Sequence, residues 1–188
     1  MEQNILKRYN EIHIMLWEEA LKQFMYNTDS CISSLKDILC GTVGEELRAI
    51  KKNAVWCLLD IRSIKTKALR KLYLDGKISH LERNSLLASN LCSACYVAMD
   101  VKYKESERSD TFKVVCLYCP IAKWREESGC HEFQVISRKI TRLRRYIIKC
   151  MNDEEKFNLG VYMSLRKAIM KKMYIVAHLE WGYEQNEV

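Results

Sequence analysis

Apolar residues recur at every third or fourth position over most of this chain, and no other feature of the sequence constrains the fold as strongly. This spacing places side chains on one face of an α-helix, whereas a half-buried strand needs strict alternation. Residues 4–26 carry one such stripe, and a second helix is predicted from Thr28 or Asp29 to Leu39, before Gly41. Only one Pro and six Gly occur in 188 residues, which also favours long helices over turn-rich β-structure.

The longest apolar pattern lies between Thr42 and the turn signal Asp75-Gly76. Thr42 and Glu45 match a capping box, in which a hydroxyl and a carboxylate satisfy free backbone N–H groups at a helix start. The pattern then continues as one heptad-like seam, which predicts a long helix packed against other helices or against a second copy of the chain. The seam consists of Leu47, Ile50, Ala54, Cys57, Ile61, Ile64 and Ala68.

Two more capping boxes mark predicted helix starts, Ser79 with Glu82 and Asn152 with Glu155. A further helix is predicted over about 132–150, between these boxes. The last helix extends to about residue 180, and its predicted core face consists of Leu159, Met163, Ala168 and Ile175. The sequence therefore predicts an all-α fold: a single helical domain over residues 1–188, built as a bundle of six or seven helices that is interrupted once.

The interruption is a cysteine cluster. Cys92 and Cys95 form one C-x2-C pair, and Cys116 and Cys119 form another twenty residues later. Each pair can bring two sulfur atoms to one ion, and two pairs complete a tetrahedral site. Thiolates are soft ligands, so Zn²⁺ or an iron–sulfur cluster is favoured over Mg²⁺ or Ca²⁺. We predict an embedded metal-binding module at 92–131 that holds Zn²⁺. An iron–sulfur cluster, or no metal at all, is the open alternative.

Cys130 and His131 are alternates for the four predicted ligands. A catalytic zinc site keeps an open coordination position and a nearby base. The sequence contains no H-E-x-x-H, and no H-x-E paired with P-C-x-x-C, so the metalloprotease and deaminase patterns are absent. We therefore predict that the metal site is structural and that the protein is not an enzyme. The polar residues 101–113 are predicted to form an exposed loop inside the metal-binding module.

The cysteines also bear on the predicted cellular setting. No run of 18 apolar residues occurs and the first 24 residues carry charges throughout, so neither a membrane span nor a signal peptide is expected. The expected location is the cytoplasm, where reducing conditions disfavour disulfides. The four cysteines outside the cluster are predicted to be small buried apolar residues. They are Cys31, Cys40, Cys57 and Cys150.

The cluster as a whole resembles small cysteine-rich zinc-knuckle accessory proteins of bacteriophages and mobile elements, which carry C-x2-C, then C-x2-C-P, then a further Cys. The resemblance is carried by Cys92, Cys95, Cys116, Cys119, Pro120, Ile121, Gly129 and Cys130. It covers about 40 of the 188 residues, and the gap of twenty is longer than is usual for that pattern. It implies a metal-binding accessory protein and, as one concrete form, a phage-type inhibitor of a host defence nuclease such as a CRISPR effector.

The helix over 132–150 is predicted to have a basic face opposite its apolar face. Its apolar residues, which follow a 3,4 spacing, are Phe133, Ile136, Ile140, Leu143 and Ile147. Its cations are Arg138, Arg142, Arg145 and Lys149, with Lys139 and Arg144 beside them. The formal net charge of the whole chain is +7. A cationic helix face of this kind fits phosphates or an acidic protein surface.

Together these features predict a non-enzymatic, zinc-stapled helical protein that binds nucleic acid or a nucleoprotein enzyme. A DNA-binding transcriptional regulator is an alternative, although Asp75-Gly76 is a poor match to the turn of a helix–turn–helix motif. An iron–sulfur protein is the second alternative. The sequence leaves open the partner, the choice of four ligands among the six candidates and the oligomeric state.

Overall fold

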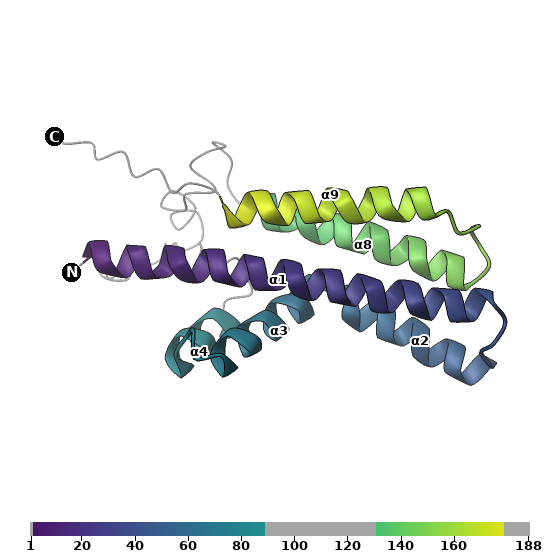
Figure 1. Ribbon diagram of the computed structural model, residues 1–188, viewed down its shortest axis with the longest axis horizontal. Coiled ribbons are helices and arrows are strands. Elements are labelled where there is room, and N and C mark those ends of the chain that lie inside the picture. Colours follow the sequence, from purple (N-terminus) through teal and green to yellow (C-terminus); the bar gives the residue numbers. More distant parts are fainter. Residues whose placement is uncertain (1, 89–130, 179–188) are drawn as a thin grey trace, which may run out of the picture.

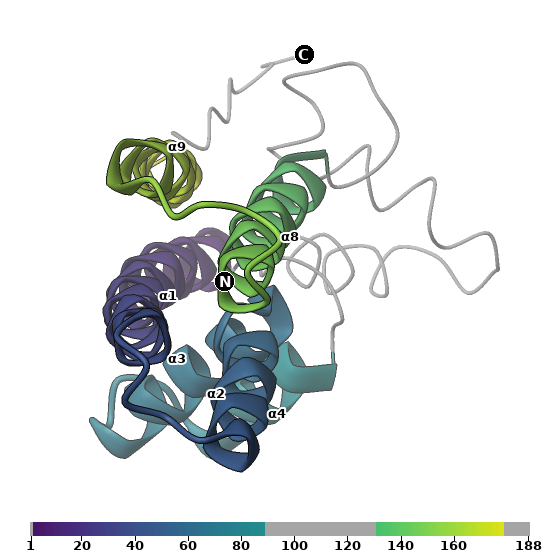
Figure 2. The ribbon, with the colours of Figure 1, turned by 90° about the vertical axis from the view of Figure 1, so that its right-hand side faces the viewer.

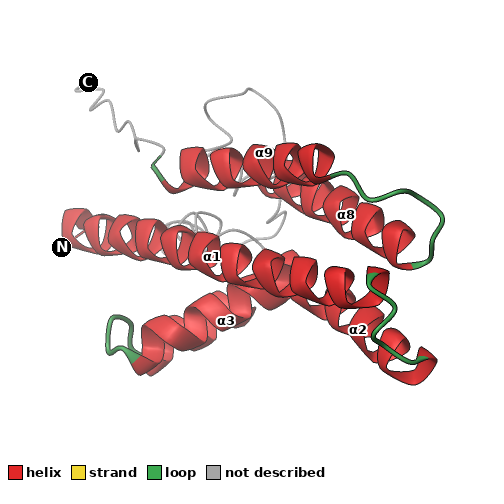
Figure 3. Cartoon of the chain, turned by 45° about the vertical axis from the view of Figure 1, so that its right-hand side comes forward, coloured by secondary structure: helices red, strands yellow, loops and turns green. Residues whose placement is uncertain are grey.

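The structure, a computed structural model, describes residues 2–88 and 131–178, and these residues form six helices and no strand (Figures 1 and 3). The helices are α1 (Glu2–Leu39), α2 (Glu45–Leu58), α3 (Ile61–Leu74), α4 (His80–Ala88), α8 (His131–Met151) and α9 (Leu159–Ala177). This confirms the predicted all-α class. Within these ranges, no helix is both long enough and apolar enough to span a membrane.

Helix α1 is the axis around which the other helices pack. Its 38 residues make a rod of about 57 Å. The antiparallel pair α8 and α9 lies along one side of α1, and α2, α3 and α4 lie along the other (Figure 1). Seen end-on, α8 lies between α9 and α2 (Figure 2), and it packs against both of them. This position gives α8 a buried face toward the body and an outer face for the candidate site.

The apolar stripe predicted at the start of the chain is buried along α1, but the predicted break at Thr28 is wrong. Ile12, Leu16, Ala20 and Phe24 are all buried, and one continuous helix extends to Leu39. The Thr28 hydroxyl donates a 2.8 Å hydrogen bond to a carbonyl of the preceding turn instead of capping a new helix. The backbone carbonyl of Thr28 accepts a bond from the buried Tyr162 hydroxyl, so contact with α9 accompanies the continuous helix there.

The long helix predicted between Thr42 and Asp75 is also wrong, because α2 ends at Leu58 and α3 begins at Ile61. Asp60 caps the new helix, since its carboxylate accepts a 2.9 Å bond from the backbone N–H of Ser63. The break divides the predicted seam. Its second half, Ile61, Ile64 and Ala68, is buried, whereas Leu47, Ile50 and Cys57 of the first half are exposed.

Side chains from two other helices satisfy the backbone carbonyl groups at this break. The amide of Asn27, itself fully buried, donates a 2.7 Å bond to the carbonyl oxygen of Leu58. Arg144 of α8 donates to the carbonyl oxygen of Leu59 over 3.4 Å, and its guanidinium lies 4.1 Å from the centre of the Trp56 ring. Carbonyl groups at a helix end need such partners when they are removed from water. The break is therefore fixed by tertiary contacts.

Replacing Asn27 by Ala is expected to lower the free energy of unfolding by about 1 to 3 kcal/mol, because the Leu58 carbonyl loses its donor in a part-buried place. Ser30→Ala is the matched control on the same helix, since its hydroxyl makes an exposed bond to the carbonyl of Tyr26. Urea denaturation followed by circular dichroism measures both changes. Equal losses of stability for the two variants would show that the bond from Asn27 to the Leu58 carbonyl contributes no more than an exposed hydrogen bond.

Of the three predicted capping boxes, one is confirmed and two are wrong, and the box at Asn152 is described below with α9. The box of Ser79 and Glu82 is confirmed, with bonds of 2.6 and 3.2 Å between backbone N–H groups and the two side chains. The box at Thr42 is wrong, because its hydroxyl donates to the carbonyl of Asp37, and Gly44 precedes α2 without a side-chain cap. The predicted stop at Gly41 is confirmed, and its φ of +69° is a conformation that favours glycine.

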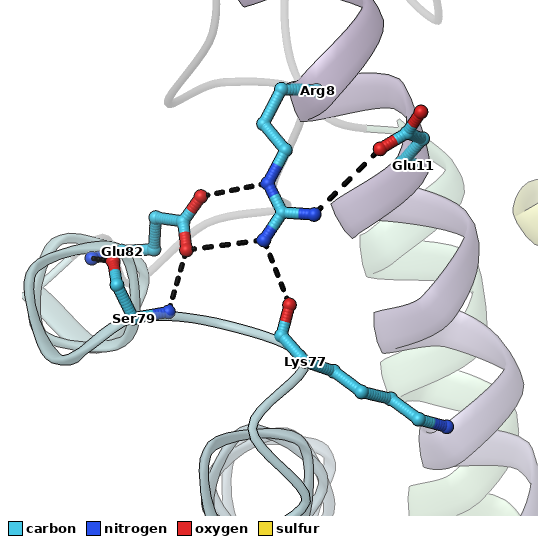
Figure 4. A network of polar contacts seen from close by, with 5 residues as sticks. All are labelled: Arg8, Glu11, Lys77, Ser79 and Glu82. Carbon is cyan, nitrogen blue, oxygen red and sulfur yellow. Dashed lines mark hydrogen bonds and ion pairs between the residues drawn. The ribbon is translucent and has the colours of Figure 1, made fainter.

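Glu82 also joins α1 to the turn between α3 and α4 (Figure 4). Both Glu82 oxygens accept bonds from Arg8, at 2.9 and 3.3 Å, and Arg8 also donates to the carbonyl of Lys77 at 2.7 Å. Burial raises the pKa of Glu82, but the bonds from Arg8 and Ser79 outweigh it, so the pKa lies below its ordinary value. The network fixes the N-terminal half of α1 on the α3–α4 turn.

The predicted start and core face of the last helix are both wrong. Helix α9 begins after Asn158, whose side chain accepts from the backbone N–H of Val161, and not after the Asn152 box. Its buried residues are Tyr162, Ile169, Met173, Val176 and Ala177, whereas Leu159, Met163, Ala168 and Ile175 are exposed. Apolar side chains occur nearly all round α9, so contact with α1 and α8 decides which face is covered.

Of the four scattered cysteines, Cys31 and Cys150 are buried as predicted, but Cys40 and Cys57 are exposed.

Candidate functional site: a cationic groove along helix α8

The five cysteines of the predicted metal module, Cys92, Cys95, Cys116, Cys119 and Cys130, lie outside the described residues. His131 is the first residue of α8, and its side chain is likewise outside the description. Within the described ranges, no group of three or more His, Cys, Asp or Glu side chains is placed to hold a metal ion. The candidate site that the described residues do form is the basic face of α8.

Helix α8 projects this face outward because its opposite face is anchored in the core. The predicted helix over 132–150 is confirmed, with bounds His131–Met151. Its buried side chains are Ile136, Ile140, Leu143, Tyr146, Ile147, Cys150 and Met151. Arg138, Arg142, Arg145 and Lys149 are exposed on consecutive turns of the other face. At 1.5 Å per residue, this row of cations extends over about 16 Å.

All four of these cations line one open groove of about 640 Å³, which we call the α8 groove. Its other lining residues come from α8, from the loop between α8 and α9, and from the first two turns of α9. They are Ser137, Thr141, Tyr146, Glu155, Val161 and Leu165. The groove thus combines a cationic wall on α8 with an apolar wall on α9.

The charges of the α8 groove are largely unneutralised. Its four cations face a single lining carboxylate, that of Glu155. Among the described residues, none of the four side chains forms an ion pair. The Arg138 side chain makes only a 3.5 Å contact with the Gln134 amide, and the side chains of the other three have no hydrogen-bond partner. Cations that share a concave surface raise the local positive potential and attract anions.

Two of the six predicted cations do not line the groove. Arg144 lies against Trp56 and the α2–α3 break, where burial lowers its pKa and the nearby Asp60 carboxylate offsets part of that shift. Lys139 is half-buried and is not among the lining residues. The structure therefore places Arg144 in the body of the protein, where its role is to pack and to hydrogen-bond.

The hairpin of α8 and α9 fixes the shape of the groove. The Tyr146 hydroxyl donates to the carbonyl of Asn158 at 3.0 Å and accepts from its backbone N–H at 2.7 Å. Helix α9 is held in turn on α1, where Arg166 pairs with Asp29 at 2.8 Å and also donates to the Thr28 hydroxyl. Hydrogen bonds and an ion pair therefore hold both walls of the groove in place.

The sequence interpretation missed the residues that turn a cationic stripe into a groove. Ser137 and Thr141 lie four residues apart beside the arginines, so a helical projection of 132–150 already places them at its edge. The sequence pattern gives no indication that the groove also includes Glu155, Val161 and Leu165. They reach the groove only because the chain reverses after α8 and α9 packs beside it.

Comparison of the chain with models of protein families, with curated proteins and with solved structures gave no match.

Proposed function

We propose that the chain is a non-enzymatic binding protein whose α8 groove holds the phosphates of a nucleic acid, either alone or within a nucleoprotein enzyme. One observation carries the proposal. Four exposed cations from consecutive turns of one helix line a single groove, and no described acidic group pairs with them. Four like charges side by side repel one another, and a polyanion that neutralises them relieves this repulsion.

The chemistry of the lining suits phosphate oxygens. Three of the four cations are arginines, whose planar guanidinium binds phosphate oxygens through two parallel hydrogen bonds. Ser137 and Thr141 add hydroxyl groups, which commonly donate to phosphate oxygens in complexes with nucleic acids. An acidic protein surface is the alternative ligand, because guanidinium and hydroxyl groups also donate to carboxylates.

The role that we assign to the groove is binding and not proton transfer. Guanidinium and ammonium groups donate hydrogen bonds and have no acceptor site, so they stabilise negative charge without acting as bases. The narrower role of inhibitor of a host defence nuclease, implied by the resemblance of the cysteine cluster, remains a prediction.

We also propose that the cysteine module at 92–131 holds one structural Zn²⁺ ion through Cys92, Cys95, Cys116 and Cys119, with Cys130 or His131 as alternates. The chemistry of the donor set supports this, because four thiolates fit the tetrahedral preference of zinc. An iron–sulfur cluster on the same thiolates is the competing assignment. In either case the bound metal would supply folding energy to its module.

Charge reversal of the groove tests the binding proposal. The triple variant Arg138→Glu, Arg142→Glu, Arg145→Glu is expected to lower affinity for a labelled oligonucleotide at least 100-fold, because attraction to phosphate becomes repulsion. Fluorescence anisotropy measures the binding, and circular dichroism verifies that the helical content is unchanged.

The matched control makes the same change of charge away from the groove. Arg62, Lys67 and Arg70 are exposed on α3 and do not line the groove, so replacing all three by Glu changes the net charge equally. This variant is expected to retain most of the affinity. If the two triple variants lose affinity equally, binding reflects net charge alone and the groove is not the site.

A further inference from the structure

We infer that the α8 groove takes one strand of nucleic acid and excludes the double helix. This inference rests on the proposed function, and it concerns only which form of nucleic acid enters the groove. It depends on two features: the concave setting of the cations and the apolar wall that α9 adds to the groove.

The concave setting disfavours a duplex. A helix that reads a duplex must protrude, because it enters a major groove about 12 Å wide. The cationic face of α8 instead forms one wall of a depression that α9 shares through Val161 and Leu165. Helix α8 packs against α9, so its cationic face does not protrude from the body as a recognition helix does.

The two walls match the two sides of a single strand. The row Arg138, Arg142, Arg145 and Lys149 can follow successive phosphates over its length of about 16 Å, which corresponds to on the order of four nucleotides. Val161, which is 43 % exposed, and the half-buried Leu165 offer apolar surface to the sugars and base faces on the other side of the strand. In a duplex the base faces are covered by stacking within the double helix.

The lining predicts little preference for base sequence. Proteins that grip single strands tightly usually stack the bases on aromatic rings. The only aromatic side chain in the lining, Tyr146, is just 6 % exposed, and both hydrogen-bonding functions of its hydroxyl are used by Asn158. Binding therefore depends mainly on phosphate contacts, and it is expected to be steeply salt-dependent.

The first experiment compares probes on the full-length protein. Labelled 12-nucleotide single strands of mixed-sequence DNA and RNA, the corresponding DNA duplex, and poly-glutamate are titrated at 50 to 200 mM NaCl. We expect single strands to bind at least tenfold more tightly than the duplex. Four phosphate contacts predict a slope of about −2.8 in log affinity against log salt, and so a loss of about 50-fold over this range.

The outcomes separate the inference from the proposed function. Equal or tighter binding of the duplex would overturn the single-strand inference and leave the proposed function intact. Binding of neither form at 50 mM NaCl would overturn both. Tighter binding of poly-glutamate than of any oligonucleotide would also overturn both, and it would assign the groove to an acidic protein. A preference between the DNA and RNA strands would support the inference and identify the form of the ligand.

A second experiment tests the apolar wall with two variants of α9. Val161→Glu places a carboxylate on the wall of the groove, and it is expected to weaken single-strand binding at least tenfold. Met163→Glu is the matched control, because Met163 is 47 % exposed on the same helix and does not line the groove. Unchanged binding by Val161→Glu would show that the strand does not contact α9, and it would overturn the inference.

Discussion

Replacing Leu143 by Ala is expected to lower the free energy of unfolding by about 2 to 5 kcal/mol. Leu143 is completely buried on the face of α8 that packs into the core, so the substitution removes apolar contacts and leaves a cavity. Total stabilities of domains lie near 5 to 15 kcal/mol, so this loss is a large fraction of the whole. Urea denaturation followed by circular dichroism measures it as a lower midpoint at an unchanged slope.

The adjacent residue provides a control that separates the two faces of α8. Arg142 is exposed in the groove, and Arg142→Ala is expected to change the free energy of unfolding by no more than about 0.5 kcal/mol. Its effect should instead be a weaker affinity for oligonucleotides, with the salt slope reduced by about 0.7. Leu143→Ala, measured where it is still folded, should bind as before. The reverse pattern would mean that the faces of α8 are assigned the wrong way round.

The double variant Cys116→Ser, Cys119→Ser is expected to lose its metal ion and to melt at a much lower temperature. Replacing two of four thiolates removes the tetrahedral site, and the binding energy of a structural zinc ion counts as folding energy. Elemental analysis of the unaltered protein should give one zinc per chain. The variant should hold less than a tenth of that amount, and its melting temperature is followed by circular dichroism.

Two exposed cysteines outside the module supply the matched control. Cys40 and Cys57 are free thiols at the surface, so replacing both by Ser should change neither the zinc content nor the melting temperature appreciably. If the purified protein is coloured and contains iron and sulfide, its bound group is an iron–sulfur cluster and not a zinc ion. If the Cys116 and Cys119 variant keeps its metal and its stability, the proposed module is wrong.

The helical class and the polarity of α8 could be predicted because both depend on residues close in sequence. A 3,4 spacing over 132–150 separates a buried face from a cationic one whatever the partner helix is. The box of Ser79 and Glu82 and the stop at Gly41 are equally local. Each involves backbone groups within a few residues, so the local sequence could indicate it, although the equally local boxes at Thr42 and Asn152 did not form.

Predictions failed where two local solutions were about equally good. The seam from Leu47 to Ala68 is compatible with one helix or two, and the break occurs where side chains 31 and 85 residues away in sequence reach the carbonyls of Leu58 and Leu59. The apolar residues of α9 offer more than one possible core face, and periodicity alone cannot rank faces of similar hydrophobicity. Packing against α1 and α8 selects the face that contains Tyr162 and Met173.

The sequence by itself determined that the described segments are helical and that α8 has a row of cations opposite its apolar face. Only the tertiary structure decided that four of the six cations share a groove and that Arg144 turns instead toward Trp56. The physical reason is the range of the interactions. Helix formation and amphipathicity arise within one segment, whereas a groove exists only once the chain has reversed and a second helix supplies the opposite wall.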